Sequence, residues 1–195
     1  MPRPANPETR SRLLRRGADL VNSRGFNATG VQEITAAAGV PKGSFYNYFD
    51  SKEAFAVEIL NEYWDSVVEL YGPILREFDT PPISRILRYF TGLAKFHERR
   101  GFAVGCLIGN MALEVASSEE VRAKLVIVYR EWSAALAECL RDAQARKELA
   151  PGKDPNQLAA TLIDAFEGAV MRAKVERGRG PFQRFERCVL PSLLA

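Results

Sequence analysis

Residues 29–52 read TGVQEITAAAGVPKGSFYNYFDSK, and this stretch predicts two short helices joined by a tight turn. The apolar residues of the first helix recur at helical spacing: Val31, Ile34 and Ala38. Thr29 is placed to cap this helix. Gly39 allows a sharp reversal of the backbone because it has no Cβ, and Pro41 suits the start of the second helix. The pattern is typical of a helix-turn-helix.

The second helix of this stretch has one apolar side and one polar side without an acid. Phe45 and Phe49 are four residues apart and are expected to pack inward. The remaining side chains suit a helix laid in a DNA major groove, where backbone contacts position the protein and base contacts specify the sequence. We expect DNA contacts from Thr29, Lys42, Gly43, Ser44, Tyr46, Asn47, Tyr48 and Lys52. Among them, Lys52 is the expected phosphate contact, whereas Ser44 and Asn47 are expected to set sequence preference.

This stretch resembles the TetR family of bacterial transcriptional regulators. The likeness is carried by Gly25-Phe26, Thr29, Val31, Ile34, Ala38-Gly39-Val40, Lys42-Gly43-Ser44-Phe45-Tyr46, Tyr48-Phe49 and Ser51-Lys52-Glu53, roughly the first quarter of the chain. Thr35 departs from the family pattern, which usually has Ala at the helix crossing, so we expect a slightly altered crossing. The resemblance implies a homodimer joined through the last two helices, a double-stranded DNA operator and a small-molecule inducer.

The charge of the chain is concentrated where DNA binding is expected. The 195 residues carry a net charge of only +3, with 47% hydrophobic and 26% charged residues, as in an ordinary globular protein. Residues 1–52 hold eight Lys or Arg against four acids, whereas the other 143 residues hold 19 against 20. No apolar run reaches membrane-spanning length and no secretion signal precedes the first helix. We therefore expect a cytoplasmic protein without a membrane partner.

Helical periodicity continues through the rest of the chain and predicts an all-α fold. Helices are expected at about 51–76, 83–100, 106–116, 118–149, 155–175 and 182–194. This pattern predicts a three-helix DNA-binding domain at residues 1–52 and a helical ligand-binding and dimerisation domain at residues 53–195. Small residues along 155–175 permit close packing against a second copy of the chain.

The second half of the chain contains a cysteine and two cations in unusual surroundings. Cys106 follows a glycine at the start of a predicted helix, a position that favours the reactive thiolate, although an inert core cysteine has the same pattern. Arg172 and Lys174 lie on an otherwise apolar helix, so each needs a partner or a ligand. Glu167 and Glu114 are the candidate carboxylate partners.

The segments GCLIGN (residues 105–110) and EGAVMRAK (residues 167–174) resemble one branch of TetR regulators, whose members respond to acrylate, N-ethylmaleimide and other electrophiles. The resemblance implies a sensing cysteine at Cys106 and a functional lysine at Lys174. We therefore expect a repressor that binds an inverted repeat and is released by an inducer acting near these two residues. The three wide-spaced cysteines favour neither a disulfide framework nor a metal site, and no cofactor motif is present.

Other functions remain open from the sequence. Reversible binding of an aromatic or carboxylated ligand would use Lys174 or Arg172 as anchor, in a site lined by Phe90, Phe102, Tyr129 and Trp132. A cysteine hydrolase would need His97, the only histidine, as its base, and nothing else in the sequence supports an enzyme. A helical partner-binding protein without DNA affinity conflicts with the uneven charge.

Overall fold

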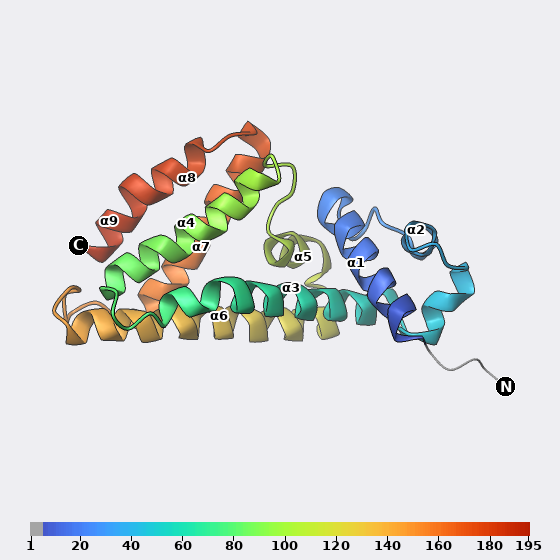
Figure 1. Cartoon of the computed structure of the whole chain (residues 1–195), viewed down its shortest axis with the longest axis horizontal. Helices are drawn as coiled ribbons and strands as arrows, with labels where there is room; N and C mark the ends of the chain where they lie inside the picture. The colour runs from blue at the N-terminus through green and yellow to red at the C-terminus, as the bar shows by residue number, and fades with distance from the viewer. Residues whose placement is uncertain (1–5) are drawn as a thin grey trace. The chain divides into compact units, whose positions relative to one another are not determined.

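The computed structural model describes residues 6–195, and all the regular elements within them are helical (Figure 1). The α-helices are α1 (Pro7–Arg24), α2 (Val31–Ala37), α3 (Lys52–Leu75), α4 (Pro82–Arg99), α5 (Leu107–Val115), α6 (Glu119–Ala145), α7 (Pro155–Glu176), α8 (Gly180–Arg184) and α9 (Leu190–Leu194). A 3₁₀ helix, η1 (Lys42–Asn47), follows α2, and a π-helical turn, η2 (Phe185–Val189), joins α8 to α9. The predicted all-α fold is confirmed. None of the described helices is both long and apolar enough to span a lipid bilayer.

The chain forms two compact units, and each is assembled from two separate segments. The first consists of the chain up to Trp64 together with Leu107–Val126, and the second consists of Asp65–Cys106 together with Ile127–Ala195. Helices α3 and α6 therefore each contribute residues to both units. Packing also groups α5 with the N-terminal helices, whereas the sequence assigned it to the C-terminal domain. The functional division at Lys52 remains a prediction.

The core of the first unit is built around three phenylalanine rings. Phe45 and Phe49 are buried, with ring centroids 5.1 Å apart, and Phe55 of α3 lies 5.5 Å and 5.0 Å from them. Gly17 of α1 faces the same cluster, where a Cβ would lie 2.4 Å from the Phe55 ring. The prediction that Phe45 and Phe49 serve packing is confirmed, and it explains why the polar residues between them face outward.

The start of α2 differs from the prediction. Gly30 is the N-cap residue, and its N–H donates to the Glu33 carboxylate at 2.8 Å. Thr29 is fully buried, and its hydroxyl donates to the Gly25 carbonyl oxygen at 2.7 Å. The expected Thr29 cap is therefore wrong, because the hydroxyl closes the preceding turn and the Glu33 side chain satisfies the helix start instead.

The turn after α2 has the predicted geometry. Gly39 adopts a φ of +67°, a left-handed conformation that glycine accepts at low cost. Thr35, at the helix crossing, is buried, and its hydroxyl donates to the Val31 and Gln32 carbonyl oxygens at 3.0 Å and 3.1 Å. The hydroxyl is thus satisfied within α2, so threonine fits a position where the family usually has alanine.

Helix α7 is the central element of the second unit, where it packs against α4, α8, η2 and α9. The rings of Phe90, Phe166, Phe182 and Phe185 form the core between these helices. The last helical segment begins at Gly180 and is interrupted by a π turn, whereas the sequence suggested one regular helix from Phe182 to Leu194. The π turn adds one residue to a turn and so rotates the face that α9 presents to α7.

Arg85 is a fully buried cation that joins three elements of the second unit. Its Nη1 donates to the Leu75 carbonyl oxygen at 2.9 Å, at the end of α3, and its Nη2 is paired with Asp142 of α6. A buried guanidinium needs such partners because its desolvation is costly. Arg85 therefore holds the end of α3 against α4 and α6.

Candidate functional sites

The side chains that η1 exposes are largely those that the sequence predicted to face outward. Lys42, Gly43 and Asn47 are exposed, and Tyr46 is 56% exposed and points away from the core. Ser44 and Tyr48 are half-buried, and the Tyr48 hydroxyl accepts a hydrogen bond from the Asn6 N–H at 2.9 Å. The element itself is a 3₁₀ helix rather than an α-helix, which places residues three apart in line. The result is an acid-free edge suited to DNA.

Two of the predicted DNA contacts have intramolecular partners instead. The Lys52 ammonium donates to the Phe26 carbonyl oxygen at 2.6 Å and lies 4.0 Å from the centroid of the Phe26 ring. Burial lowers the pKa of Lys52, and nearby carboxylates, led by Glu53, partly oppose this. The Thr29 hydroxyl is likewise buried and bonded to Gly25. Both residues shape the loop before α2, and a phosphate contact by the half-buried Lys52 stays a prediction.

The same loop is held by α5, an arrangement that the sequence did not indicate. The Asn27 N–H of the loop donates to Glu114 Oε2 at 2.9 Å. The Asn110 side-chain amide of α5 also donates to Asn22 Oδ1, on the adjoining helix α1, at 3.2 Å. Gly25, at a φ of +94°, lies so close that a Cβ would be 2.6 Å from the Glu114 carboxylate. Glu114 therefore belongs to the first unit, and Arg172 pairs with Glu176 rather than with Glu114.

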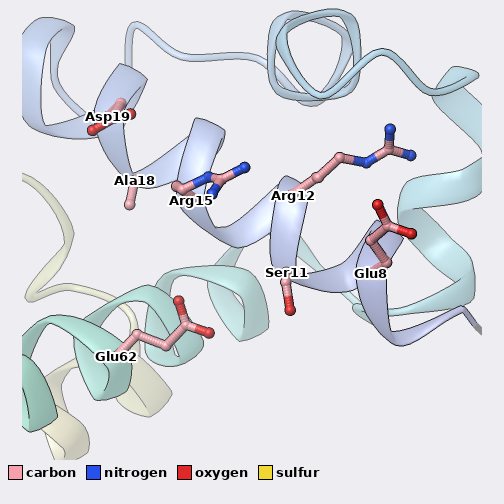
Figure 2. Close-up of a pocket in the computed structure, with 7 residues that line it drawn as sticks. All are labelled: Glu8, Ser11, Arg12, Arg15, Ala18, Asp19 and Glu62. Carbon is pink, nitrogen blue, oxygen red and sulfur yellow. The ribbon is translucent and has the colours of Figure 1, made fainter.

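A groove of about 620 Å³ lies between α1 and α3 in the first unit (Figure 2). Arg12 and Arg15 project from α1, and three carboxylates line the groove with them: Glu8, Asp19 and Glu62. Three carboxylates face two guanidinium groups, so the groove carries no net positive charge that would favour an anion such as a phosphate. None of its residues was a predicted site residue.

Cys106 is 6% exposed and directly precedes Leu107, the first residue of α5. Its thiol hydrogen-bonds to the carboxyl group of Glu167 on α7. Burial raises the pKa of Glu167 from 4.5 to about 7, and the bond to Cys106 partly opposes the shift. Cys106 and Glu167, both predicted site residues, are thus brought together, and the expected role of Lys174 beside the thiol stays a prediction.

Two of the four predicted aromatic residues lie near this pair. Burial raises the pKa of Tyr129 far above its ordinary value, and the charges of Glu167 and Cys106 add to the rise. Trp132, on the same helix, is 3% exposed and lies beside Tyr89, whose pKa is raised by burial and also by the charge of Cys106. Cys106, Glu167, Tyr129 and Trp132 are hereafter called the thiol cluster.

The other two aromatic residues belong to the phenylalanine core. Phe90 is fully buried, with its centroid 5.1 Å from that of Phe166. Phe102 is half-buried at a φ of +55° and faces Phe182 with centroids 6.3 Å apart. Phe166 directly precedes Glu167 on α7, so this core adjoins the thiol cluster through the backbone of that helix.

The two cations of α7 are placed differently. Arg172 is exposed and forms a surface ion pair at 2.7 Å with Glu176, one turn further along the helix. Lys174 is half-buried in the last turn of α7, where its positive charge interacts favourably with the negative end of the helix dipole. The structure thus separates Arg172 from the thiol cluster by assigning it a solvent-facing partner.

His97, the base required by a cysteine hydrolase, is part of the aromatic core. Its ring is 4% exposed and stacks on Phe182 with centroids 5.8 Å apart and an interplanar angle of 22°. Burial lowers the pKa of His97 to about 4, although the Val104 backbone partly opposes this shift. The histidine is therefore neutral near pH 7.

Comparison with known proteins defines the class of this chain. Residues 13–59 match the family described as bacterial regulatory proteins, tetR family, and residues 82–189 match the tetracyclin repressor-like C-terminal domain. The chain belongs to the TetR family of transcriptional regulators, which confirms the resemblance and assigns it to regulators rather than enzymes.

Several relatives match over almost the whole chain. The HTH-type transcriptional repressor DhaR of Mycobacterium sp. (strain GP1) is 35% identical, over 97% of this chain and 94% of that protein. The transcriptional regulator AcuR of Cereibacter sphaeroides is 37% identical, over 90% and 80%. The crystal structure of E. coli NemR in its reduced form superposes with a TM-score of 0.86 at 31% identity, over 96% and 97% of the two chains.

Proposed function

We propose that this protein is a cytoplasmic transcriptional repressor that binds an inverted-repeat operator as a homodimer and is released when an electrophile reacts at Cys106. DNA binding is a property of its family, and two similar proteins, DhaR and NemR, are named repressors. The operator-reading role of η1 is supported by the outward Tyr46, Asn47 and Lys42 side chains on an edge without acids.

The homodimer is supported by the exposed side of α7. Met171 and Val175 are 58% and 80% exposed, and both are large apolar side chains one turn apart on that helix. Covering them with the same face of a second copy removes this apolar surface from water. Two copies would present two η1 edges to successive major grooves of the operator.

The observation that carries the sensing proposal is the position of Cys106. It belongs to the thiol cluster of the second unit, and the next residue in the chain begins α5 of the first unit. The other end of α5 holds the loop before α2 through Glu114 and Asn27. Adding a group to the buried Cys106 thiol must displace its neighbours. Because α5 follows Cys106 directly in the chain, a shift of Cys106 also moves α5 and the loop before α2 that positions η1. A hundredfold loss of DNA affinity requires only about 2.7 kcal/mol.

The test is DNA release by the wild type and by Cys106→Ser. An operator is first selected from a random duplex library, and its binding is followed by fluorescence anisotropy with and without N-ethylmaleimide. Wild type is expected to lose about a hundredfold in affinity, whereas Cys106→Ser stays bound. Cys188→Ser, which removes an exposed cysteine, is the control and behaves as wild type. Release of Cys106→Ser by the electrophile would overturn covalent sensing and favour a reversible ligand.

A further inference from the structure

The thiol cluster contains an ionisable group whose hydrogen-bonding capacity is only partly used. One interaction of the Glu167 carboxyl is the bond to the Cys106 thiol. Its Oε1 atom is buried and has no hydrogen-bond partner among residues 6–195. A buried carboxyl oxygen without a partner is costly, so the arrangement requires an explanation beyond packing. A proton held by this carboxyl, or a ligand that hydrogen-bonds to it, would remove that cost.

The geometry matches the needs of one reaction, the addition of a thiol to an activated alkene. A thiol that adds to the β-carbon must lose its proton, and the α-carbon must gain one. We infer that Glu167 takes the Cys106 proton and returns it to the adduct, so that this site selects neutral activated alkenes, such as enones, maleimides or acrylamide, over anionic ones such as acrylate. The inference rests on the proposed sensing role of Cys106 and specifies its chemistry.

The step balances without an added reagent. The S–H bond breaks as the proton moves to the Glu167 carboxylate, and the sulfur lone pair forms the S–C bond at the β-carbon. The π electrons of the alkene move toward the carbonyl group to give an enolate, which the Glu167 carboxylic acid then protonates at the α-carbon. Nothing is oxidised or reduced, and the carboxylate is regenerated.

The charge of the site explains the selectivity. A carboxylate ligand would bring a second negative charge next to a carboxylate in partly buried surroundings, where like charges repel strongly. The other ionisable groups that act with the pair are Tyr129 on α6 and Tyr89 on α4, whereas Asp164 on α7 acts on Tyr129. Burial raises the pKa of both tyrosines far above neutral pH, so both phenols stay neutral, and a phenol has no cationic form that could offset the ligand's charge. A neutral alkene meets no such repulsion.

The test is the rate at which Cys106 is alkylated in the full-length protein, resolved by peptide mass spectrometry, with acrylamide and acrylate as the two probes. In wild type the rate with acrylamide is expected to rise with an inflection near the Glu167 pKa of about 7. Glu167→Gln can still accept the thiol hydrogen bond but cannot take its proton. We expect it to react about ten- to a hundredfold more slowly at neutral pH, without that inflection, and to discriminate less between the two probes.

Three controls separate this role from a structural one. Asp164→Asn removes a carboxylate from an exposed position on the same helix and should leave the profile unchanged. Glu167→Asp retains the proton acceptor and should retain the inflection at a lower rate. Alkylation of the buried Cys139 reports any loosening of the fold. Equal or faster reaction of Glu167→Gln, which simple charge repulsion predicts, overturns the inference. Alkylation of wild type at Cys106 without DNA release overturns the proposed function and leaves the chemistry of Glu167 standing.

Discussion

Glu114 accepts two hydrogen bonds from Asn27, one from the backbone N–H to Oε2 at 2.9 Å and one from the side-chain Nδ2 to the Glu114 carbonyl oxygen at 3.3 Å. The two residues lie 87 positions apart in the sequence, and they join the last turn of α5 to the loop that precedes α2. This contact ties the helix that begins beside Cys106 to the part of the chain that positions η1.

Replacing Glu114 by alanine should therefore weaken the response to the inducer. A hydrogen bond to a carboxylate contributes about 1.5–3 kcal/mol, which is comparable with the free energy of a hundredfold change in affinity. We expect Glu114→Ala to bind the operator within about threefold of wild type before alkylation, but to lose only about tenfold in affinity afterwards. Fluorescence anisotropy checks both values. Leu113→Ala, at an 82% exposed position on the same helix, should respond as wild type.

Two glycines provide a matched test of the packing around Glu114. Gly39→Ala places a Cβ in open space at a φ of +67° and should cost about 1–2 kcal/mol from backbone strain alone. Gly25→Ala combines a φ of +94° with a Cβ only 2.6 Å from the Glu114 carboxylate and should cost about 1–3 kcal/mol more. Urea unfolding gives the two values. In the Glu114→Ala background, the unfolding free energies of Gly25→Ala and Gly39→Ala should differ less than in wild type. An unchanged difference would argue against a clash between the new Cβ at position 25 and Glu114.

Lys42 and Lys52 should affect DNA binding for different reasons. Lys42 is exposed on η1, so Lys42→Ala should weaken binding similarly on cognate and scrambled DNA and lower the salt slope by about 1, with unchanged stability. Lys52 is bonded to the Phe26 carbonyl oxygen, so Lys52→Ala should lower the unfolding free energy by about 1–2 kcal/mol. Thermal unfolding and salt titrations separate the two effects. A stable Lys52→Ala protein with a reduced salt slope would instead support Lys52 as a phosphate contact.

The pH dependence of stability should reveal the buried carboxyl of Glu167. Burial raises its pKa from 4.5 to about 7. Between these values the folded protein holds a proton that the unfolded chain has released, so the unfolding free energy falls as pH rises. Relative to Glu167→Gln, wild type should lose about 2–3 kcal/mol across this range. His97, whose pKa burial lowers to about 4, acts in the opposite direction, but it is present in both proteins and cancels in the difference.

Much of the fold could be predicted because its signals are local. The spacing of apolar residues, the glycine turn at Gly39 and the prolines at helix starts depend on neighbours within a few positions. Helices α3, α4 and α5 accordingly begin and end within a few residues of the predicted bounds. The buried Phe45 and the exposed Tyr46 follow from the same periodicity. Thr29 shows where such reasoning fails, because its hydroxyl donates to the Gly25 carbonyl oxygen and the Glu33 carboxylate accepts from the Gly30 N–H at the helix start instead.

The sequence by itself determined that this chain is helical, that its first helices form a DNA-binding helix-turn-helix and that Cys106 stands at the start of a helix. Each conclusion rests on residue types within a few positions of one another in the chain. Only the tertiary structure decided the partners of the charged groups. Glu167 lies at Cys106, Glu114 holds Asn27, and Lys52 turns inward to Phe26. These pairs join residues far apart in the chain, and which of several carboxylates meets a given donor depends on how the helices pack, which no local pattern specifies.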